Sequence, residues 1–348
     1  MPPTPSAASA ERAAVALPAC HPMHPSPLFA TTYHPDACRI IRQPASLTSD
    51  VPMTDHDQLS RFLLPAAGVR GVHVRLTQAW HDIQGAAEYP PAARQLLGEA
   101  AVAAALFTGH TKVDGRLSVQ LRGNETLRTL FAECTAAGTL RGIVQLADGA
   151  DAPADLRELG EAALLAITIE NPGLDPREPQ RYQSLVGMQA PDLAEAFETY
   201  FHQSEQLPTR LLLAAGPDQA AGLLLQKLPG DEGDNDGWTR IGALFDTLGA
   251  PELLSVAGED LLHRLFHEEE PQLLGDKPLS FGCSCSRERV ASMLQSLGEE
   301  EARAAAEATG EVEVRCEFCG REYHFPLTAL DVLFSAAQPS LEAPERLQ

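Results

Sequence analysis

Four cysteines near the C-terminal end of the chain have the spacing of a metal site. Cys283-Ser-Cys285 forms one pair, and Cys316-Glu-Phe-Cys319 follows after 30 intervening residues. Zinc prefers four soft ligands in a tetrahedron, each sulfur about 2.3 Å from the ion. A Cys-x-x-Cys turn followed by glycine is a compact way to present two thiolates, and alternate residues of an extended Cys-x-Cys segment lie on one side. The spacing predicts that these four cysteines bind one zinc ion per chain.

The segment between the two pairs has a periodicity of its own. A helix is predicted from one apolar face (Val290, Met293, Leu294 and Leu297). A second helix is expected over residues 298–309, ending at Gly310, and a strand over residues 311–315. These elements would fold the chain back and bring the pairs together. Four arginines flank the sulfurs and would offset the charge of a zinc tetrathiolate (Arg287, Arg289, Arg315 and Arg321). His324 is a competing ligand, but four cysteines already complete a structural zinc shell.

Several roles remain open for such a site. A plain zinc site that staples a small domain is the simplest. A disulfide across the short Cys283–Cys285 loop would be strained, and strained disulfides tend to be labile or regulatory, which favours a redox-sensitive site. A thiol–disulfide oxidoreductase using Cys316 and Cys319 is an alternative, although a thioredoxin-like site would place its Cys-x-x-Cys early in a βαβ unit. A zinc ribbon that binds nucleic acid is the third.

Composition restricts these choices. The chain has 348 residues, 44% of them hydrophobic, and a formal net charge of −22. That charge disfavours binding to nucleic acid and to an anionic membrane surface, since both need a concentrated positive patch. No apolar run reaches the 18 residues of a membrane helix, so a soluble protein is expected. Seven cysteines, an odd number, fit a reducing compartment better than a secreted disulfide scaffold. Cys134, in an apolar context, is expected to be a buried structural thiol.

The elements that must position the site belong to an α+β protein. Residues 1–52 hold ten of the 27 prolines and are expected to be a disordered extension, consistent with translation starting at Met53. Residues 53–230 are predicted to form an α/β-sheet core domain. Its strands are expected at residues 69–76, 116–121, 140–146, 164–169, 181–188, 210–215 and 222–228. Its helices are expected at residues 95–107 and from Asp192 to about Gln203. Residues 281–337 would be the zinc-binding domain and residues 338–348 a disordered tail.

Residues 231–280 read as an acidic helical linker. They contain 12 acidic and three basic residues, a net charge of −9. Two apolar faces nevertheless recur at helical spacing (Ile241, Leu244, Phe245 and Leu248; Leu261, Leu262, Leu265 and Phe266). Crowded like charges oppose compaction, which indicates a marginally folded segment that depends on a neighbour. An ordinary helical linker with a solvated acidic face remains the alternative.

The C-terminal pattern CSCSRERV … CEFCGREYHF, with HEEE at residues 267–270, resembles the bacterial 33 kDa chaperonin family of redox-regulated heat-shock chaperones. RYQSLVGM at residues 181–188, SEQLPTRL at residues 204–211 and the opening DQLSRFLL from Asp57 are also similar to that family. The resemblance covers about residues 53–336, and the paired cysteine motif is highly specific. The 52-residue extension matches nothing in the family pattern.

The resemblance implies a cytoplasmic, ATP-independent holdase rather than an enzyme, with unfolded client proteins as partners. The family's zinc ligands carry over onto Cys283, Cys285, Cys316 and Cys319. Members are inactive while reduced and zinc-bound. Oxidation would form the disulfides Cys283–Cys285 and Cys316–Cys319, eject zinc, unfold the C-terminal part and promote a homodimer through the core domain. The resemblance implies no catalytic residue, no other cofactor and no nucleic-acid or membrane partner.

Overall fold

The computed structural model describes residues 57–173, 178–230, 233–307 and 309–335. The expected extension at residues 1–52 and the expected tail at residues 338–348 therefore lie outside the described residues. Within the described ranges, no helix combines the length and the apolar content that crossing a bilayer requires.

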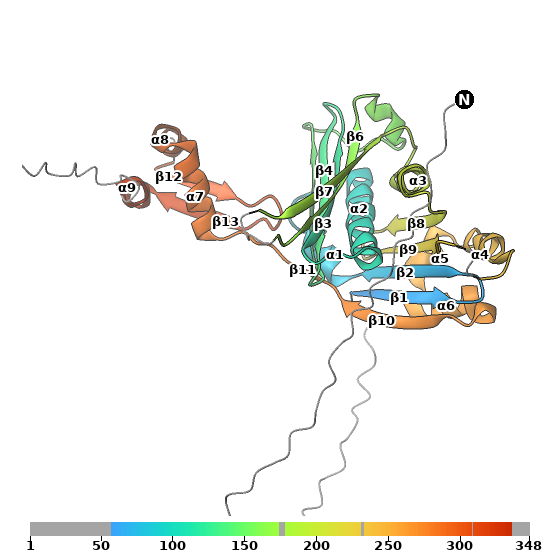
Figure 1. Ribbon diagram of the computed structural model, residues 1–348. Coiled ribbons are helices and arrows are strands. Elements are labelled where there is room, and N and C mark those ends of the chain that lie inside the picture. Colours follow the sequence, from blue (N-terminus) through green and yellow to red (C-terminus); the bar gives the residue numbers. More distant parts are fainter. Residues whose placement is uncertain (1–56, 174–177, 231–232, 308, 336–348) are drawn as a thin grey trace, which may run out of the picture. The chain divides into compact units, whose positions relative to one another are not determined.

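Two mainly antiparallel sheets enclose one long helix (Figure 1). The five-stranded sheet has the order β10 (Gln272–Pro278), β1 (Gln58–Leu64), β2 (Val69–Leu76), β9 (Ala220–Lys227), β8 (Thr209–Ala215). The six-stranded sheet has the order β11 (Ser280–Phe281), β5 (Thr139–Leu146), β4 (Leu127–Thr135), β3 (Arg116–Arg122), β6 (Leu164–Asn171), β7 (Gln180–Gly187). Helix α2 (Pro91–His110) contacts strands of both sheets.

Helix α2 occupies this central position because it is apolar around most of its circumference, as a fully buried helix must be. Residues Ala100–Ala105 are completely buried, and their small side chains let strands approach the helix axis closely. Pro91 stands in the first turn, where its missing N–H costs nothing. Helix α1 (Gln78–Gln84) places Trp80 in the same core.

The predicted α+β class is confirmed, and the strands predicted in the core correspond to β2, β3, β5, β6, β7, β8 and β9. The helix predicted from Asp192 is α3 (Leu193–Tyr200), whose first turn is capped by the Asp192 carboxylate accepting from the N–H of Glu195. It continues as a π-helical turn, η2 (Phe201–Glu205). A short 3-10 turn, η1 (Leu156–Leu159), precedes β6.

Among the strands of the two large sheets, β1, β4, β10 and the two-residue β11 were not predicted. β4 has alternating buried positions at Leu130, Ala132 and Cys134, but alanine and cysteine give a weak strand signal. β1 lies directly beside β2 and opens the sheet. β10 falls inside the stretch expected to be a helical linker, so the helical prediction for residues 231–280 fails at residues 272–278. β10 pairs with β1 as an edge strand through its backbone, and its side chains, such as Leu273, stay exposed.

The helices of that stretch cover the sheet face opposite α2 (Figure 1). We call α4 (Gly237–Phe245), α5 (Ala250–Ser255) and α6 (Gly258–Phe266) the three-helix segment; the turn η3 (His267–Glu269) follows it. Both predicted apolar stripes are buried against this face of the sheet, which presents Phe62, Val69, Leu223 and Leu225 among others. The segment therefore has a neighbour to pack on, the five-stranded sheet, whereas its marginal stability stays a prediction.

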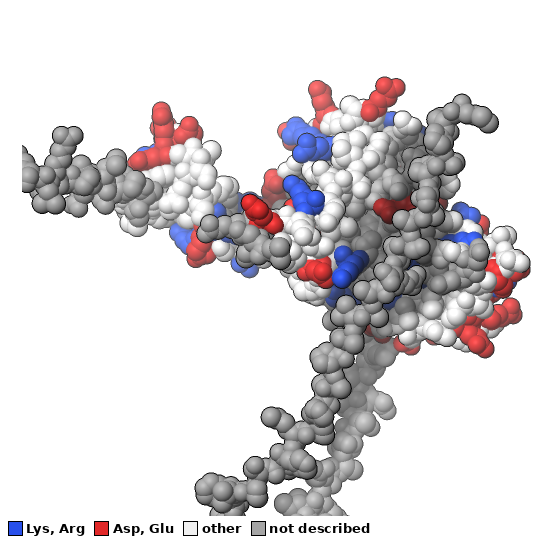
Figure 2. Space-filling view, in the orientation of Figure 1, with Lys and Arg blue, Asp and Glu red and all other residues white. Residues whose placement is uncertain are grey.

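Arg240 of α4 compensates part of the acidic charge in the segment. Its guanidinium pairs with Asp234 at 2.9 Å, with Asp236 at 3.1 Å and with Glu269 at 2.5 Å. Glu269 is only 6% exposed, and its ion pair with Arg240 joins α4 to the turn that follows α6. Acidic side chains otherwise gather at the surface near the segment and over α8 (Glu299–Ala306) (Figure 2).

The cysteine module, residues 281–335, has a small apolar core of its own. It contains α7 (Arg287–Leu297), α8, β12 (Glu311–Arg315), β13 (Glu322–Pro326) and α9 (Leu327–Ser335). The two predicted helices and the predicted strand are α7, α8 and β12. Ser286 caps α7 by accepting a hydrogen bond from the N–H of Arg289, so the helix begins directly after Cys285. β13 and α9 were not predicted.

Candidate metal centre

The two cysteine pairs lie on two different local structures. Cys283 and Cys285 follow β11 in an extended segment that leads into α7. Cys316 and Cys319 sit in the tight connection between β12 and β13, where the N–H of Gly320 donates to the carbonyl of Cys316 at 2.8 Å. Gly320 has a φ of 67°, a left-handed conformation that favours glycine after the second cysteine. β12 and β13 form the antiparallel hairpin that carries this turn back to the first pair.

The four sulfur atoms form one cluster. All four lie within 4.8 Å of one another, with 3.7 Å between the sulfurs of Cys283 and Cys316 and 3.3 Å between those of Cys285 and Cys319. Four sulfurs at about 2.3 Å from a tetrahedral zinc ion would be about 3.8 Å apart. The four cysteines can therefore hold a metal ion, and the all-sulfur donor set is compatible with zinc.

Tyr323 is the residue of this site that sequence reasoning missed. Its hydroxyl donates to the sulfur of Cys285 at 3.1 Å. Burial by itself raises the pKa of Cys285, but the hydrogen bond from Tyr323 and the three neighbouring thiols outweigh it and lower that pKa to about 7. Burial and the surrounding thiols raise the pKa of Cys319 to about 12. A metal ion between the four sulfurs would supply the positive charge that stabilises all of them as thiolates.

The four flanking arginines do not all face the sulfurs. Arg321 is the one whose charge interacts with Cys285 and Cys319. Arg287 stacks over Phe325 at 4.3 Å, and Arg289 donates to the carbonyl of Ser284 at 2.8 Å. His324, the competing ligand, faces away and pairs with Glu311 at 3.3 Å. Among the described residues, the cluster that could hold a metal ion therefore consists of the four cysteines without histidine.

The residues between the cysteines contact the six-stranded sheet. The guanidinium of Arg141 on β5 lies 4.5 Å from the ring centre of Phe318 and donates to the Ser284 hydroxyl at 3.2 Å. Phe318 also meets Phe131 of β4 edge to face. The amide of Gln145 donates to the carboxylate of Glu317 at 3.0 Å. Residues beside both cysteine pairs thus contact β4 or β5, which sequence spacing does not reveal.

Cys134 is separate from this cluster. It is completely buried on β4, and burial raises the pKa of its thiol to about 11, as expected for an inert structural cysteine.

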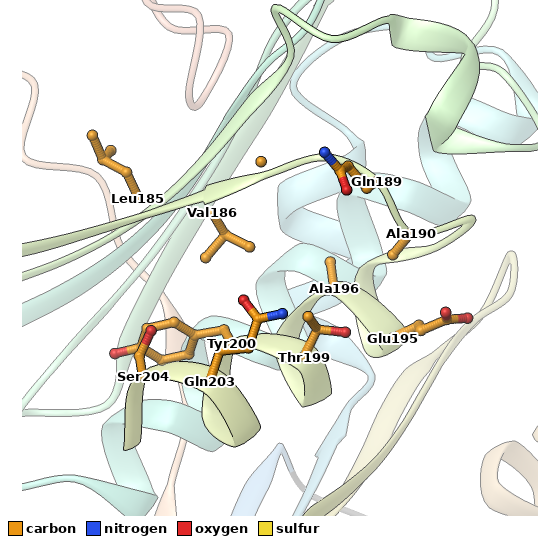
Figure 3. A pocket seen from close by; sticks show the side chains of 11 residues that line it. Leu185, Val186, Gln189, Ala190, Glu195, Ala196, Thr199, Tyr200, Gln203 and Ser204 are labelled. Atoms are coloured by element: carbon orange, nitrogen blue, oxygen red, sulfur yellow. The ribbon is translucent and has the colours of Figure 1, made fainter. Parts of the chain in front are cut away.

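A cavity of about 270 Å³ lies between β7 and the helical stretch α3–η2 (Figure 3). In the close view, Tyr200, Gln203 and Thr199 rise from the helical side, and Val186 points toward them from the strand. Hydroxyl and amide groups and the carboxylate of Glu195 line it. Among its lining residues there is no thiol and no imidazole, so it adds nothing to the chemistry of the cysteine cluster.

Comparisons with known proteins agree on one family. The model of the family described as Hsp33 protein matches residues 57–326. The 33 kDa chaperonin of Chromobacterium violaceum is 39% identical over 81% of this chain and 95% of its own length, and that of Ectopseudomonas mendocina is 42% identical over 84% and 99%. The crystal structure of the 33 kDa chaperonin from Thermotoga maritima has the same fold, with a TM-score of 0.67, 22% identity, and coverage of 81% of this chain and 100% of that one. The names of these relatives support a chaperone role. The chain belongs to the Hsp33 family.

Proposed function

We propose that this chain is a redox-regulated, ATP-independent holdase of the cytoplasm whose switch is the four-cysteine cluster. The observation that carries the proposal is the convergence of four half-buried thiols, within 4.8 Å, in a module with a small core. A bound zinc ion would cross-link both cysteine pairs and stabilise their thiolates. Family membership and the donor set support this assignment.

The energetics support a switch rather than a passive staple. A structural zinc site contributes on the order of 10 kcal/mol to folding. A core as small as that of the cysteine module rarely supplies more than about 3–5 kcal/mol. Loss of the thiolate ligands should therefore unfold the module, even with two short disulfide loops in their place.

Peroxide is the class of oxidant we propose. One thiol attacks the peroxide as its thiolate, and the proton it gave up goes to the departing peroxide oxygen, so that a sulfenic acid forms and water leaves; the partner thiol then displaces a second water from the sulfenic acid and closes the disulfide. Each disulfide thus consumes one peroxide, which takes two electrons and two protons from the two thiols. We propose the pairs Cys283–Cys285 and Cys316–Cys319. In the folded cluster, sulfur contacts of 3.7 Å and 3.3 Å join cysteines of different pairs. Once the module opens, the partner cysteine separated by only one or two intervening residues has the higher effective concentration.

The three-helix segment is the proposed target of the switch. It is joined to the cysteine module through β10 and β11, and β11 ends two residues before Cys283. When the module unfolds, this anchor is lost, and the segment can leave the apolar sheet face that includes Phe62, Val69 and Leu225. That face would bind the apolar side chains of unfolded clients. The β7 edge, with exposed Tyr182 and Leu185, adjoins the groove in Figure 3 and offers a further apolar surface.

The proposal also assigns the parts of the chain. Residues 53–230 act as the chaperone core and the surface of a homodimer in the oxidised state, residues 231–280 as the metastable linker, and residues 281–337 as the zinc-binding switch. The oxidoreductase alternative is not favoured, because the sulfurs of Cys316 and Cys319 lie against those of Cys283 and Cys285 in one four-sulfur cluster instead of forming a separate two-cysteine site.

The test compares the reduced, zinc-loaded protein with the protein treated with peroxide. A chemically unfolded model enzyme is diluted into each without ATP, and aggregation is followed by light scattering. Only the oxidised protein should suppress aggregation, after losing about one zinc per chain by elemental analysis. Equal suppression by both forms would show that the chaperone is not redox-regulated. Peptide mapping that found Cys283 linked to Cys316 would refute the proposed pairing.

A further inference from the structure

His73 of β2 lies buried beneath the three-helix segment. It is 2% exposed and sits on the sheet face that the segment covers. Gly258, the first residue of α6, lies directly on its ring: a Cβ added there would be 2.8 Å from Nδ1 and 2.9 Å from Cε1 of His73. The buried Nε2 atom of His73 has no hydrogen-bond partner. The sheet and the segment thus enclose an imidazole that they do not satisfy.

The groups around His73 do not favour a positive charge. Its cross-strand partners are Ser60 on β1 and Leu223 on β9, and the charge that acts on it is that of Arg75 on β2. Arg75 donates to the carbonyl of Val256, two residues before α6 begins, at 3.0 Å. α6 presents the positive end of its dipole to this site.

The carboxylates of the covering helices do not provide a counter-charge for a protonated His73. Glu259 and Asp260 in the first turn of α6 are exposed, and Glu252 of α5 pairs with Arg264. Within the described residues, none of the ion pairs includes His73. A proton on His73 therefore has no counter-charge while the segment is docked.

We propose that His73 makes docking of the three-helix segment sensitive to pH, so that mild acid uncovers the apolar sheet face without oxidation of the cysteines. The inference rests on the proposed function only in taking this face to be a client surface. Acid would then be a second stimulus for the same segment. It would act through His73 beneath the segment, whereas oxidation acts through the cysteine module.

The direction in which pH changes the docking of the three-helix segment follows from the burial of His73. Burial, with a smaller contribution from the charge of Arg75, lowers the pKa of His73 from 6.5 to about 4. The docked state therefore holds a neutral imidazole, whereas the undocked state exposes it to water and lets it take a proton below pH 6.5. Docking is unaffected above pH 7, weakens as the pH falls through 6.5, and stops changing near pH 4. One proton with this shift changes the docking equilibrium by about thirtyfold at most between pH 7.5 and pH 5.

Hydrogen exchange of the reduced, zinc-loaded full chain measures docking directly. After correction for the intrinsic pH dependence of exchange, the opening constant of amides in residues 237–266 should rise by about tenfold to thirtyfold between pH 7.5 and pH 5. His73→Leu replaces the imidazole with an apolar side chain of similar size that cannot take up a proton. In this variant the rise of the opening constant should disappear. His110→Gln is the matched control: burial lowers the pKa of His110 to about 4 as well, but His110 sits at the end of α2 beside Arg70. Its replacement should leave the response of the segment unchanged.

A second pair of variants tests the contact itself. Gly258→Ala should open the segment already at pH 7.5, because the new methyl group meets the His73 ring. Adding His73→Ala should restore docking and leave it independent of pH. A wild-type protein with equal protection at both pH values, or a His73→Leu protein that keeps the full rise, would overturn the inference. Loosening at pH 5 without suppression of aggregation would instead contradict the client surface of the proposed function.

Discussion

At the scale of single residues, the four clustered cysteines should differ from Cys134 in their contribution to zinc affinity. We expect Cys283→Ser to lower zinc affinity by more than about 100-fold, because a serine hydroxyl does not replace a thiolate ligand and even outer-shell partners are worth 10–100-fold. Competition with a chromophoric chelator measures the affinity. Cys134→Ser is the matched control, since Cys134 is buried on β4 away from the cluster. Unchanged affinity in Cys283→Ser would remove Cys283 from the site.

At the scale of elements, the ion pair between Arg240 and Glu269 closes the three-helix segment. Arg240→Met leaves the buried Glu269 carboxylate without its cation, which is unfavourable. We expect faster amide exchange in residues 237–266 at pH 7.5, in the reduced and zinc-loaded protein, with exchange in α2 unchanged. Arg264→Met is the control, because Arg264 is exposed and its contact with Glu252 is 3.8 Å long. Equal effects of the two variants would show that the Arg240 pair has no special role in docking.

At the scale of the whole molecule, the separate cores predict which parts survive oxidation. The core around α2 does not share buried residues with the core under the three-helix segment or with that of the cysteine module. After peroxide treatment, we expect amide protection to be lost across residues 237–266 and 282–335 and kept across α2, β3, β4 and β6. Hydrogen exchange of the two forms measures this. Protection retained in residues 282–335 while aggregation is suppressed would refute zinc-coupled unfolding as the mechanism.

Local patterns in the sequence predicted much of the molecule. The spacing of Cys283, Cys285, Cys316 and Cys319 indicated one cluster that could hold a metal ion, because cysteine pairs of this type close on themselves through short turns. Alternation and helical spacing located most strands of the core and the apolar stripes at Ile241 and Leu261, since these periods follow from burying one face. The edge strand β10 was not predicted, because it pairs with β1 through its backbone rather than through its side chains.

The sequence by itself determined the α+β class, the four candidate ligands and the apolar faces that must be buried, because each depends on residues near one another in the chain. Only the tertiary structure decided what those faces are buried against. It placed α2 between two sheets, the hydroxyl of Tyr323 on Cys285, and Gly258 on the ring of His73. Each of these contacts joins segments distant in sequence or on different elements. Their energy comes from packing and desolvation at the contact, which no local period encodes.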